Sequence, residues 1–146
     1  MHVLNNLSRD AMQIAARNGS TQVLSLIHDH GGEISTRGPK GDTLYHLAAS
    51  NGHVNVLTWL TEHVYRGAGI AGDAVDMFGQ TAAHVAARRG EVAVLRYLHG
   101  ELGVDVLQED FDGHTPLEVI PKLFLSGNAE GLVDVKEFLT SVIDLK

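Results

Sequence analysis

Histidine is the residue type in this sequence that is best suited to metal or acid–base chemistry. The chain has nine histidines, and a neutral imidazole is a common ligand of zinc. A zinc site on one helix needs two histidines four residues apart, so that both rings lie on the same face. No pair of histidines here has that spacing. We therefore expect no metal site, and we expect His28, His30 and His63, which lie near predicted helix ends, to complement the helix dipole instead.

Other residue types that carry catalysis do not form known motifs. The chain has no Gly-x-x-x-x-Gly-Lys-Ser/Thr sequence, no Gly-x-Ser-x-Gly sequence and no dinucleotide-binding fingerprint. Asp110, Asp112 and Gly113 resemble part of a calcium-binding loop, but the required glutamate does not follow at the right spacing. We expect a protein that is not an enzyme and that has no catalytic residues and no cofactor.

Four similar segments repeat along the sequence, and His46 and His84 occupy the same position in two of them. The segments begin at Asp10, Thr43, Thr81 and Thr115, which lie 33, 38 and 34 residues apart. The second reads TLYHLAA and the third reads TAAHVAA. A period near 33 residues is typical of stacked helical units, none of which can bury its apolar face alone. Function is then expected on a surface and not in a catalytic pocket.

The local signals describe how each unit is built. Thr43 and Thr81 can each cap a helix through the hydroxyl, and His46 and His84 can hydrogen-bond these threonines and the nearby backbone. In the first three segments a glycine nine residues after the start (Gly19, Gly52 or Gly90) ends the first helix, because glycine enters the left-handed conformation freely. Apolar residues at helical spacing then predict a second helix.

The repeated pattern resembles the ankyrin repeat. That family has an Asp-x-x-Gly-x-Thr-Pro-Leu-His-x-Ala-Ala opening, then Gly-His, an apolar helix and a Gly-Ala-Asp-Val-Asn ending. Residues 43–53 follow the opening and the Gly-His, residues 76–81 and 110–117 match the start, and residues 103–106 match the ending. The resemblance covers roughly residues 8–139. It implies an all-α ankyrin-repeat solenoid of stacked helix-turn-helix units with β-hairpin-like connecting loops.

We expect one domain over residues 1–146, with repeats near 8–40, 41–78, 79–112 and 113–146. The end units depart from the pattern as caps do: Gln13 and Glu118 replace the histidine, and Pro121 stands where a helix should continue. The five extra residues within Val64–Gly72 form either a tolerated surface insertion or a partner contact. Near the C-terminus, apolar residues at helical spacing predict a capping helix, or one that docks onto another protein or a second copy; they are Leu132, Val133, Val135, Phe138, Leu139 and Val142.

Composition narrows the class of protein. Apolar residues make up 44% of the chain, and there is no cysteine, so disulfides do not contribute. Residues 101–146 hold three lysines and ten acidic residues, which account for the whole net charge of −7. An acidic end disfavours a nucleic-acid partner, and no apolar run is long enough for membrane insertion. We expect an intracellular protein, cytoplasmic or nuclear, which can be part of a longer chain.

The resemblance implies a concave binding side made by residues after the Ala-Ala pair and by residues near the loop tips. The candidate partner-binding residues are Arg17, Asn18, Lys40, Asp42, Ser50, Asn51, Met77, Phe78, Gln80, Arg88, Arg89, Phe111, Asp112 and His114.

Two properties of this set predict what it binds. Met77, Phe78 and Phe111 are either apolar anchors for a partner or are shielded by loops that pack side by side. The arginines and Lys40 form either a cationic strip for acidic or phosphorylated side chains or an ordinary solvated face. An apolar anchor and a cationic strip together predict a partner peptide with apolar residues beside acidic ones.

The leading prediction is a protein-interaction module that acts as a scaffold, adaptor or inhibitor. One alternative is a module that recruits substrate to a larger enzyme. Another is an ankyrin inhibitor of a kinase or a transcription factor, as in the cyclin-dependent kinase inhibitors or the NF-kappaB inhibitors. A metal-binding or hydrolytic role for the histidines is a weaker alternative. Self-association is left open.

Overall fold

The computed structural model describes residues 2–31, 38, 40–63, 74–120 and 129–145. Over these residues the regular structure is helical and no strand occurs, which confirms the all-α prediction. No helix within the described ranges is both long and apolar enough to cross a membrane. The helices are α1 (His2–Asn18), α2 (Thr21–Asp29), α3 (Leu44–Ser50), α4 (Val54–His63), α5 (Ala82–Arg89), α6 (Val92–Gly100) and α7 (Ala129–Asp144).

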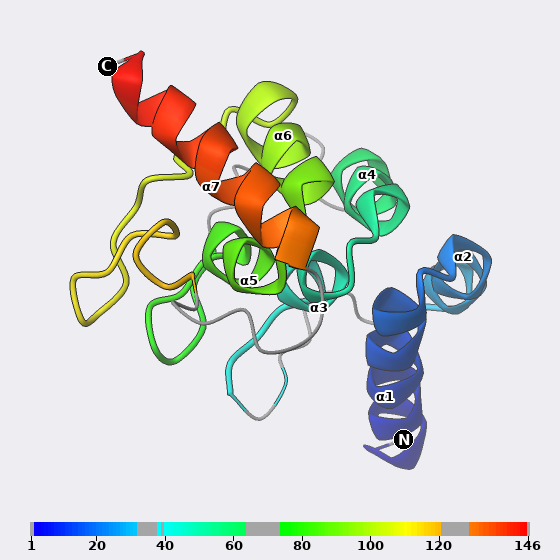
Figure 1. Cartoon of the computed structure of the whole chain (residues 1–146). Coiled ribbons are helices and arrows are strands. Elements are labelled where there is room, and N and C mark those ends of the chain that lie inside the picture. The colour runs from blue at the N-terminus through cyan, green and yellow to red at the C-terminus, as the bar shows by residue number, and fades with distance from the viewer. Residues whose placement is uncertain (1, 32–37, 39, 64–73, 121–128, 146) are drawn as a thin grey trace.

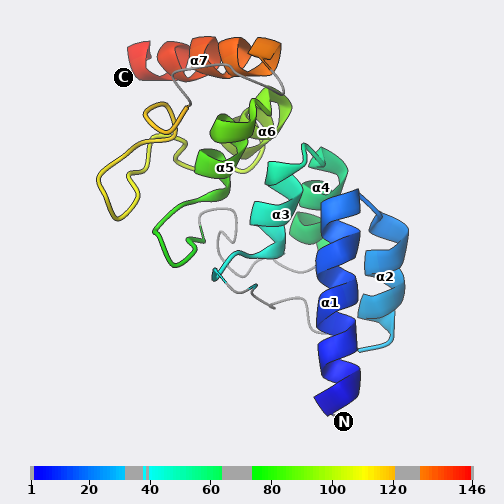
Figure 2. The same ribbon diagram turned by 60° about the horizontal axis from the view of Figure 1, so that its bottom comes forward.

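The helices form a stack of antiparallel pairs. The pairs α1–α2, α3–α4 and α5–α6 follow one another along the stack, and each first helix contacts the first helix of the next pair. Figures 1 and 2 show the connecting loops projecting on the side of the first helices, while α2, α4 and α6 lie on the other side. The last helix, α7, lies across α5 and α6 and closes that end of the stack.

The threonine and histidine of each unit start its first helix. Thr43 Oγ1 accepts the backbone N–H of His46, and the Thr43 N–H donates to His46 Nδ1 at 3.1 Å. Thr81 and His84 form the same reciprocal pair, also with an N–H to Nδ1 distance of 3.1 Å. Each pair satisfies two donors that a helix start otherwise leaves without a partner. The predicted caps are therefore confirmed.

The last unit keeps this cap but not the helix. Glu118 takes the place of the histidine, and its Oε1 accepts the Thr115 N–H at 3.2 Å. Residues 116–120 nevertheless form turns. The sequence supplies a reason, because Pro121 disfavours the helical conformation at Ile120. The fourth unit therefore presents a capped turn instead of a first helix.

Small residues along the first helices allow close packing between units. Ala48, Ala49, Ala86 and Ala87 are fully buried between neighbouring pairs. The second helices contribute larger side chains, and burying each of these contributes about 1.5–3 kcal/mol. These side chains join the alanines in one continuous core; they include Leu24, Leu57, Leu60, Leu95 and Leu98.

The first helix is longer than its repeat position predicts. It begins at His2, whereas α3 and α5 begin directly after their capping threonines. The segment before Asp10 contains no proline or glycine, so nothing in it interrupts a helix. The repeat pattern carries no information about this extension, because the extension lies ahead of the first unit.

The buried histidines also join each unit to the loop that follows. Since the Thr43 N–H donates to Nδ1 of His46, that nitrogen carries no proton, and the Nε2–H donates to the carbonyl of Gln80 at 2.7 Å. His84 makes the same bond to the carbonyl of His114 at 2.8 Å. The predicted structural role of these two histidines is confirmed, and it extends across the boundary between units.

The C-terminal helix caps the stack as predicted. Four apolar side chains of α7 are buried: Leu132, Val135, Leu139 and Val142. Phe138 packs against the hydrophobic core, and the Arg96 guanidinium lies 5.4 Å from its ring centre. Of the apolar residues that predicted this helix, Val133 is exposed. The extra residues of Val64–Gly72 lie outside the described ranges.

We predict that His84→Ala lowers the free energy of unfolding by about 2–3 kcal/mol, because it removes the cap and one of the two N–H donors to the His114 carbonyl, which also accepts the Asp110 N–H. Chemical unfolding monitored by circular dichroism would measure the loss. His30→Ala is the matched control, since that side chain is exposed and its loss should stay within about 0.5 kcal/mol. Equal losses in the two variants would contradict a structural role for His84.

We further predict that acid destabilises the fold through His84. Burial lowers the pKa of His84 below the ordinary 6.5, so the unfolded chain binds its proton first. Its contribution to stability is complete above about pH 6.5 and declines as pH falls through the lower folded pKa. Unfolding free energies at about pH 7 and about pH 5 should differ more in the wild type than in His84→Ala. An equal pH dependence would assign the acid sensitivity to other groups.

Candidate functional site

Buried or half-buried aspartates shape the tips of two connecting loops. Asp76 Oδ1 accepts the N–H groups of Phe78 at 2.9 Å and Gln80 at 3.0 Å. In the next loop Asp110 Oδ1 accepts the N–H groups of Asp112 and His114, both at 2.9 Å. Each carboxylate holds its tip in a tight turn from within.

The Asp110 carboxylate is therefore committed to the loop. The donated N–H of His114 is the main cause that lowers the pKa of Asp110 below its ordinary 3.8, and the Asp112 N–H acts in the same direction. The side chain of Asp110 also lies within 4.8 Å of those of Asp112 and His114. Because Asp110 Oδ1 already accepts two backbone N–H groups, this acidic cluster is accounted for by the turn itself.

Backbone hydrogen bonds tie each loop to the next. The Met77 N–H donates to the Lys40 carbonyl at 2.9 Å, and the Phe111 N–H donates to the Phe78 carbonyl at 3.1 Å. Gly79 has φ 75° and lies directly under Phe111, so that a Cβ at this position would collide with the Phe111 ring. The loops thus form a continuous row whose spacing is fixed by main-chain contacts.

The row of loops presents large apolar side chains to solvent. Met77 is 59% exposed, Phe78 is 50% exposed and Phe111 is 72% exposed. One interpretation was that neighbouring loops shield these residues. The loops do pack side by side, but this packing leaves the three side chains exposed. Exposed aromatic groups on a fixed backbone are suited to act as anchors for a partner.

A depression of about 200 Å³ lies between two loops and the first helices behind them. On one side Arg88 donates from Nη2 to Gln80 Oε1 at 2.7 Å. The structure brings six of the predicted site residues into this groove: Lys40, Asp42, Ser50, Phe78, Gln80 and Arg88.

The other predicted residues lie around this groove and do not line it. Arg17, Asn18 and Arg89 are exposed at the ends of α1 and α5. Asn51 donates from Nδ2 to the Leu47 carbonyl at 3.0 Å, so its amide serves its own helix. The remaining four are exposed on the loop tips: Met77, Phe111, Asp112 and His114.

Sequence reasoning missed four lining residues of the groove. His46 was predicted to have only a structural role, and Asp76 only to belong to the opening of a repeat; both make structural hydrogen bonds and also line the groove. Leu47 and Val85 form an apolar floor. They lie one helical turn before Ser50 and Arg88, and helical spacing alone places such pairs on one face. That spacing was the signal that could have identified them.

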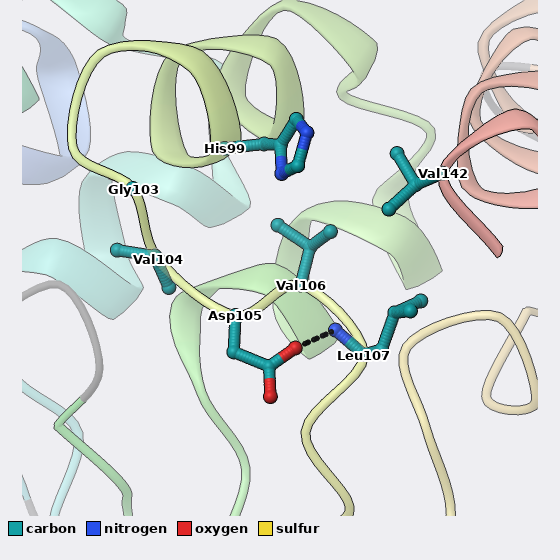
Figure 3. Close-up of a pocket in the computed structure, with 7 residues that line it drawn as sticks. All are labelled: His99, Gly103, Val104, Asp105, Val106, Leu107 and Val142. Carbon is teal, nitrogen blue, oxygen red and sulfur yellow. Dashed lines mark hydrogen bonds between the residues drawn. The ribbon is translucent and has the colours of Figure 1, made fainter. Parts of the chain in front are cut away.

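A second hollow, of about 230 Å³, lies where the end of α6 and residues 103–107 meet α7. Figure 3 shows two of its three valines, Val106 and Val142, facing one another. Its titratable lining residues are His99 and Asp105, and Asp105 points away from His99 to accept the Leu107 N–H at 2.9 Å. The hollow is a packing gap beneath the capping helix, without a pair of converging acid and base groups.

Comparison with known proteins agrees with this architecture. Ankyrin repeats in three copies match residues 1–71, and ankyrin repeats in many copies match residues 64–120. The chain is 31% identical over 102 residues to Diacylglycerol kinase zeta of Rattus norvegicus, which covers 70% of this chain and 10% of that protein. It is 29% identical over 113 residues to Alpha-latrotoxin-Lh1a of Latrodectus hasselti, covering 75% of this chain and 8% of the toxin.

This chain therefore spans about a tenth of the length of these two relatives. The likeness is confined to that part of each protein and does not extend to the rest of either. Together with the paired helices and the threonine–histidine caps, these matches establish that the chain belongs to the ankyrin repeat family, whose repeats generally serve as modules for binding other proteins.

Proposed function

We propose that this chain binds a partner protein through the groove and the neighbouring loop tips, and that the bound segment carries an aromatic or aliphatic residue beside a carboxylate or phosphate. The observation that carries the proposal is that Phe78 and Arg88 line one depression. An apolar surface and a guanidinium are thereby offered to the same short segment.

The apolar half of the site favours contact through side chains that are already in place. The backbones of Met77, Phe78 and Phe111 are fixed by bonds between loops and, for Phe78, by a bond to Asp76. A partner therefore need not order these loops when it binds, which lowers the entropy cost of association. Leu47 and Val85 extend the apolar surface to the floor of the groove.

The charged half of the site favours an anion. Arg88 is exposed and donates one N–H to Gln80, and a guanidinium has five N–H donors, so others can receive a carboxylate in a bidentate manner. Arg89 adds a second positive charge next to it. On the other rim Lys40 and Asp42 have opposite charges, so the preference for an acidic group should reside at Arg88.

Such binding can serve a scaffold, an adaptor or an inhibitor. The likeness to part of Diacylglycerol kinase zeta favours a second version, in which a stack of this kind recruits a substrate or regulator to an enzyme. Both versions use the same groove. They differ in whether the captured protein is changed chemically after it binds.

Selection from a random peptide display library against the wild-type protein would test the proposal. We predict enriched peptides with an aromatic or aliphatic residue next to Asp or Glu. Arg88→Glu should weaken their binding by about 1–3 kcal/mol through the loss of charge-assisted hydrogen bonds, and Phe78→Ala should weaken it by a similar amount. Calorimetric titration of the wild type and the two variants would measure both effects.

Matched controls separate this site from general surface effects. Lys136→Glu reverses an exposed charge on α7, and Leu145→Ala shortens an exposed apolar side chain at the end of the chain. Neither change should alter peptide affinity, and all four variants should unfold within about 0.5 kcal/mol of the wild type. Peptides that lose as much affinity with Lys136→Glu as with Arg88→Glu would contradict the proposed groove.

A further inference from the structure

The pairing of an aliphatic side chain with an arginine occurs twice on the first helices. On α5, Val85 and Arg88 both line the groove, four and seven residues after the threonine that starts their segment. On α1, Ile14 and Arg17 stand four and seven residues after the start of the first segment. A separation of three residues is close to one helical turn, so the two members of each pair lie on one face of their helix.

Burial indicates that both pairs lie on the same side of the stack. The same three positions of the segment are buried on the two helices: Met12, Ala15 and Ala16 on α1, and Ala83, Ala86 and Ala87 on α5. Ile14 is 53% exposed and Val85 is half-buried. Arg17 and Arg88 are both exposed. Because the buried face has the same register in both helices, the α1 pair lies on the side that in α5 forms the groove.

The middle unit separates the two pairs. Helix α3 contacts both α1 and α5 and lies between them (Figures 1 and 2). Its residues at the two corresponding positions are Leu47 and Ser50, which both line the groove. An aliphatic side chain therefore occupies the first position in all three units, whereas a guanidinium occupies the second position on α1 and α5 and a hydroxyl occupies it on α3.

Hydrogen bonds to the second unit hold the end of α1 in place. His53 donates from Nε2 to the Arg17 carbonyl at 2.9 Å, and Asn55 donates from Nδ2 to the Gly19 carbonyl, also at 2.9 Å. A Cβ at Gly19 would collide with the His53 ring, so the second unit packs directly against this end of the helix. The backbone of Arg17 is consequently held at a fixed distance from the groove.

One acidic residue bears on where an anion can bind along α1. Asp10 is exposed and lies seven residues before Arg17, which is about 10 Å along a helix axis. That separation is about one Debye length at an ionic strength of about 0.1 M, so repulsion from Asp10 is largely screened near Arg17. An anion is therefore expected at the C-terminal end of α1, where Ile14 lies about one turn before the guanidinium.

From this repetition we propose that Ile14 and Arg17 form a second subsite for the same partner segment, an inference that rests on the binding function proposed above. The segment crosses α1, α3 and α5 as an extended chain and carries two acidic residues, one for Arg17 and one for Arg88. Packed helices lie about 8–10 Å apart, so α1 and α5 are separated by about 16–20 Å. An extended chain rises about 3.3 Å per residue, so the two acidic residues should lie about five or six positions apart.

Fluorescence polarisation with labelled synthetic peptides tests this inference. Each peptide carries two Phe-Glu pairs joined by a Gly/Ser spacer of varied length, and a peptide with one Phe-Glu pair is the reference. The wild type should bind most tightly when the spacer has about three or four residues, which places the two glutamates about five or six positions apart. Its affinity for that peptide should exceed its affinity for the reference about five- to thirty-fold, because the second pair binds within the same complex.

Charge reversal identifies the residue that is responsible. Arg17→Glu should reduce the affinity for the best two-pair peptide to that for the reference, and it should change the affinity for the reference less than about two-fold. Replacing one peptide glutamate by lysine should restore the affinity for Arg17→Glu, since the two charges are exchanged; both such peptides are made, because the chain can cross the stack in either direction. Lys136→Glu on α7 is the matched control and should bind every peptide like the wild type, and circular dichroism checks that each variant is folded.

The outcomes separate this inference from the proposed function. An affinity that does not depend on spacer length, or that is unchanged by Arg17→Glu, would overturn the second subsite, and Arg17 would then serve only to complement the C-terminal end of α1. Reference binding that is weakened by Arg88→Glu would leave the groove itself supported in that case. If no peptide of the series binds, or if Arg88→Glu binds the reference as the wild type does, both proposals are wrong.

Discussion

The buried neutral imidazole is the interaction on which the order of this stack depends. His46 and His84 each accept an N–H from the threonine that begins their own helix, and this leaves Nε2–H to reach the carbonyl that precedes the next unit. One side chain thereby sets both the start of a helix and the position of the following loop. Each of these carbonyls also accepts an N–H within its own loop, from Asp76 or Asp110, so the histidine bond adds the contact that joins that loop to the preceding unit.

The loops that form the proposed partner-binding surface depend on the same bonds. The histidine bond fixes the base of a loop, the aspartate within the loop fixes its tip, and a main-chain bond fixes the distance to the neighbouring tip. Phe78 and Phe111 are therefore exposed without being loosely held. In the proposed binding surface, the exposed side chains therefore project from loops that buried or half-buried groups hold in place.

The sequence allowed the repeats, the helix caps, the capping helix and six lining residues of the groove to be predicted, because each depends on local spacing. It did not reveal that Arg17 lies outside the groove lining while Leu47 forms part of it. That distinction depends on how successive units pack against one another, which is a tertiary property. Exposure of Ile14 and Leu26 was equally hidden, since the residues that replace them in other units are similarly apolar.

The unequal ends of the stack bear on how the protein opens. Each unit is held mainly by its immediate neighbours, so the cost of detaching one depends on how many sides are covered. Among the described helices, the α5–α6 pair lies between α3–α4 and α7, whereas α1–α2 contacts a neighbouring pair on one side only. Amide hydrogens of α2 should then exchange with solvent through local fraying long before those of α5. The stack is therefore expected to open from the α1–α2 end inward, so the stability of that end limits how long the stack stays fully folded.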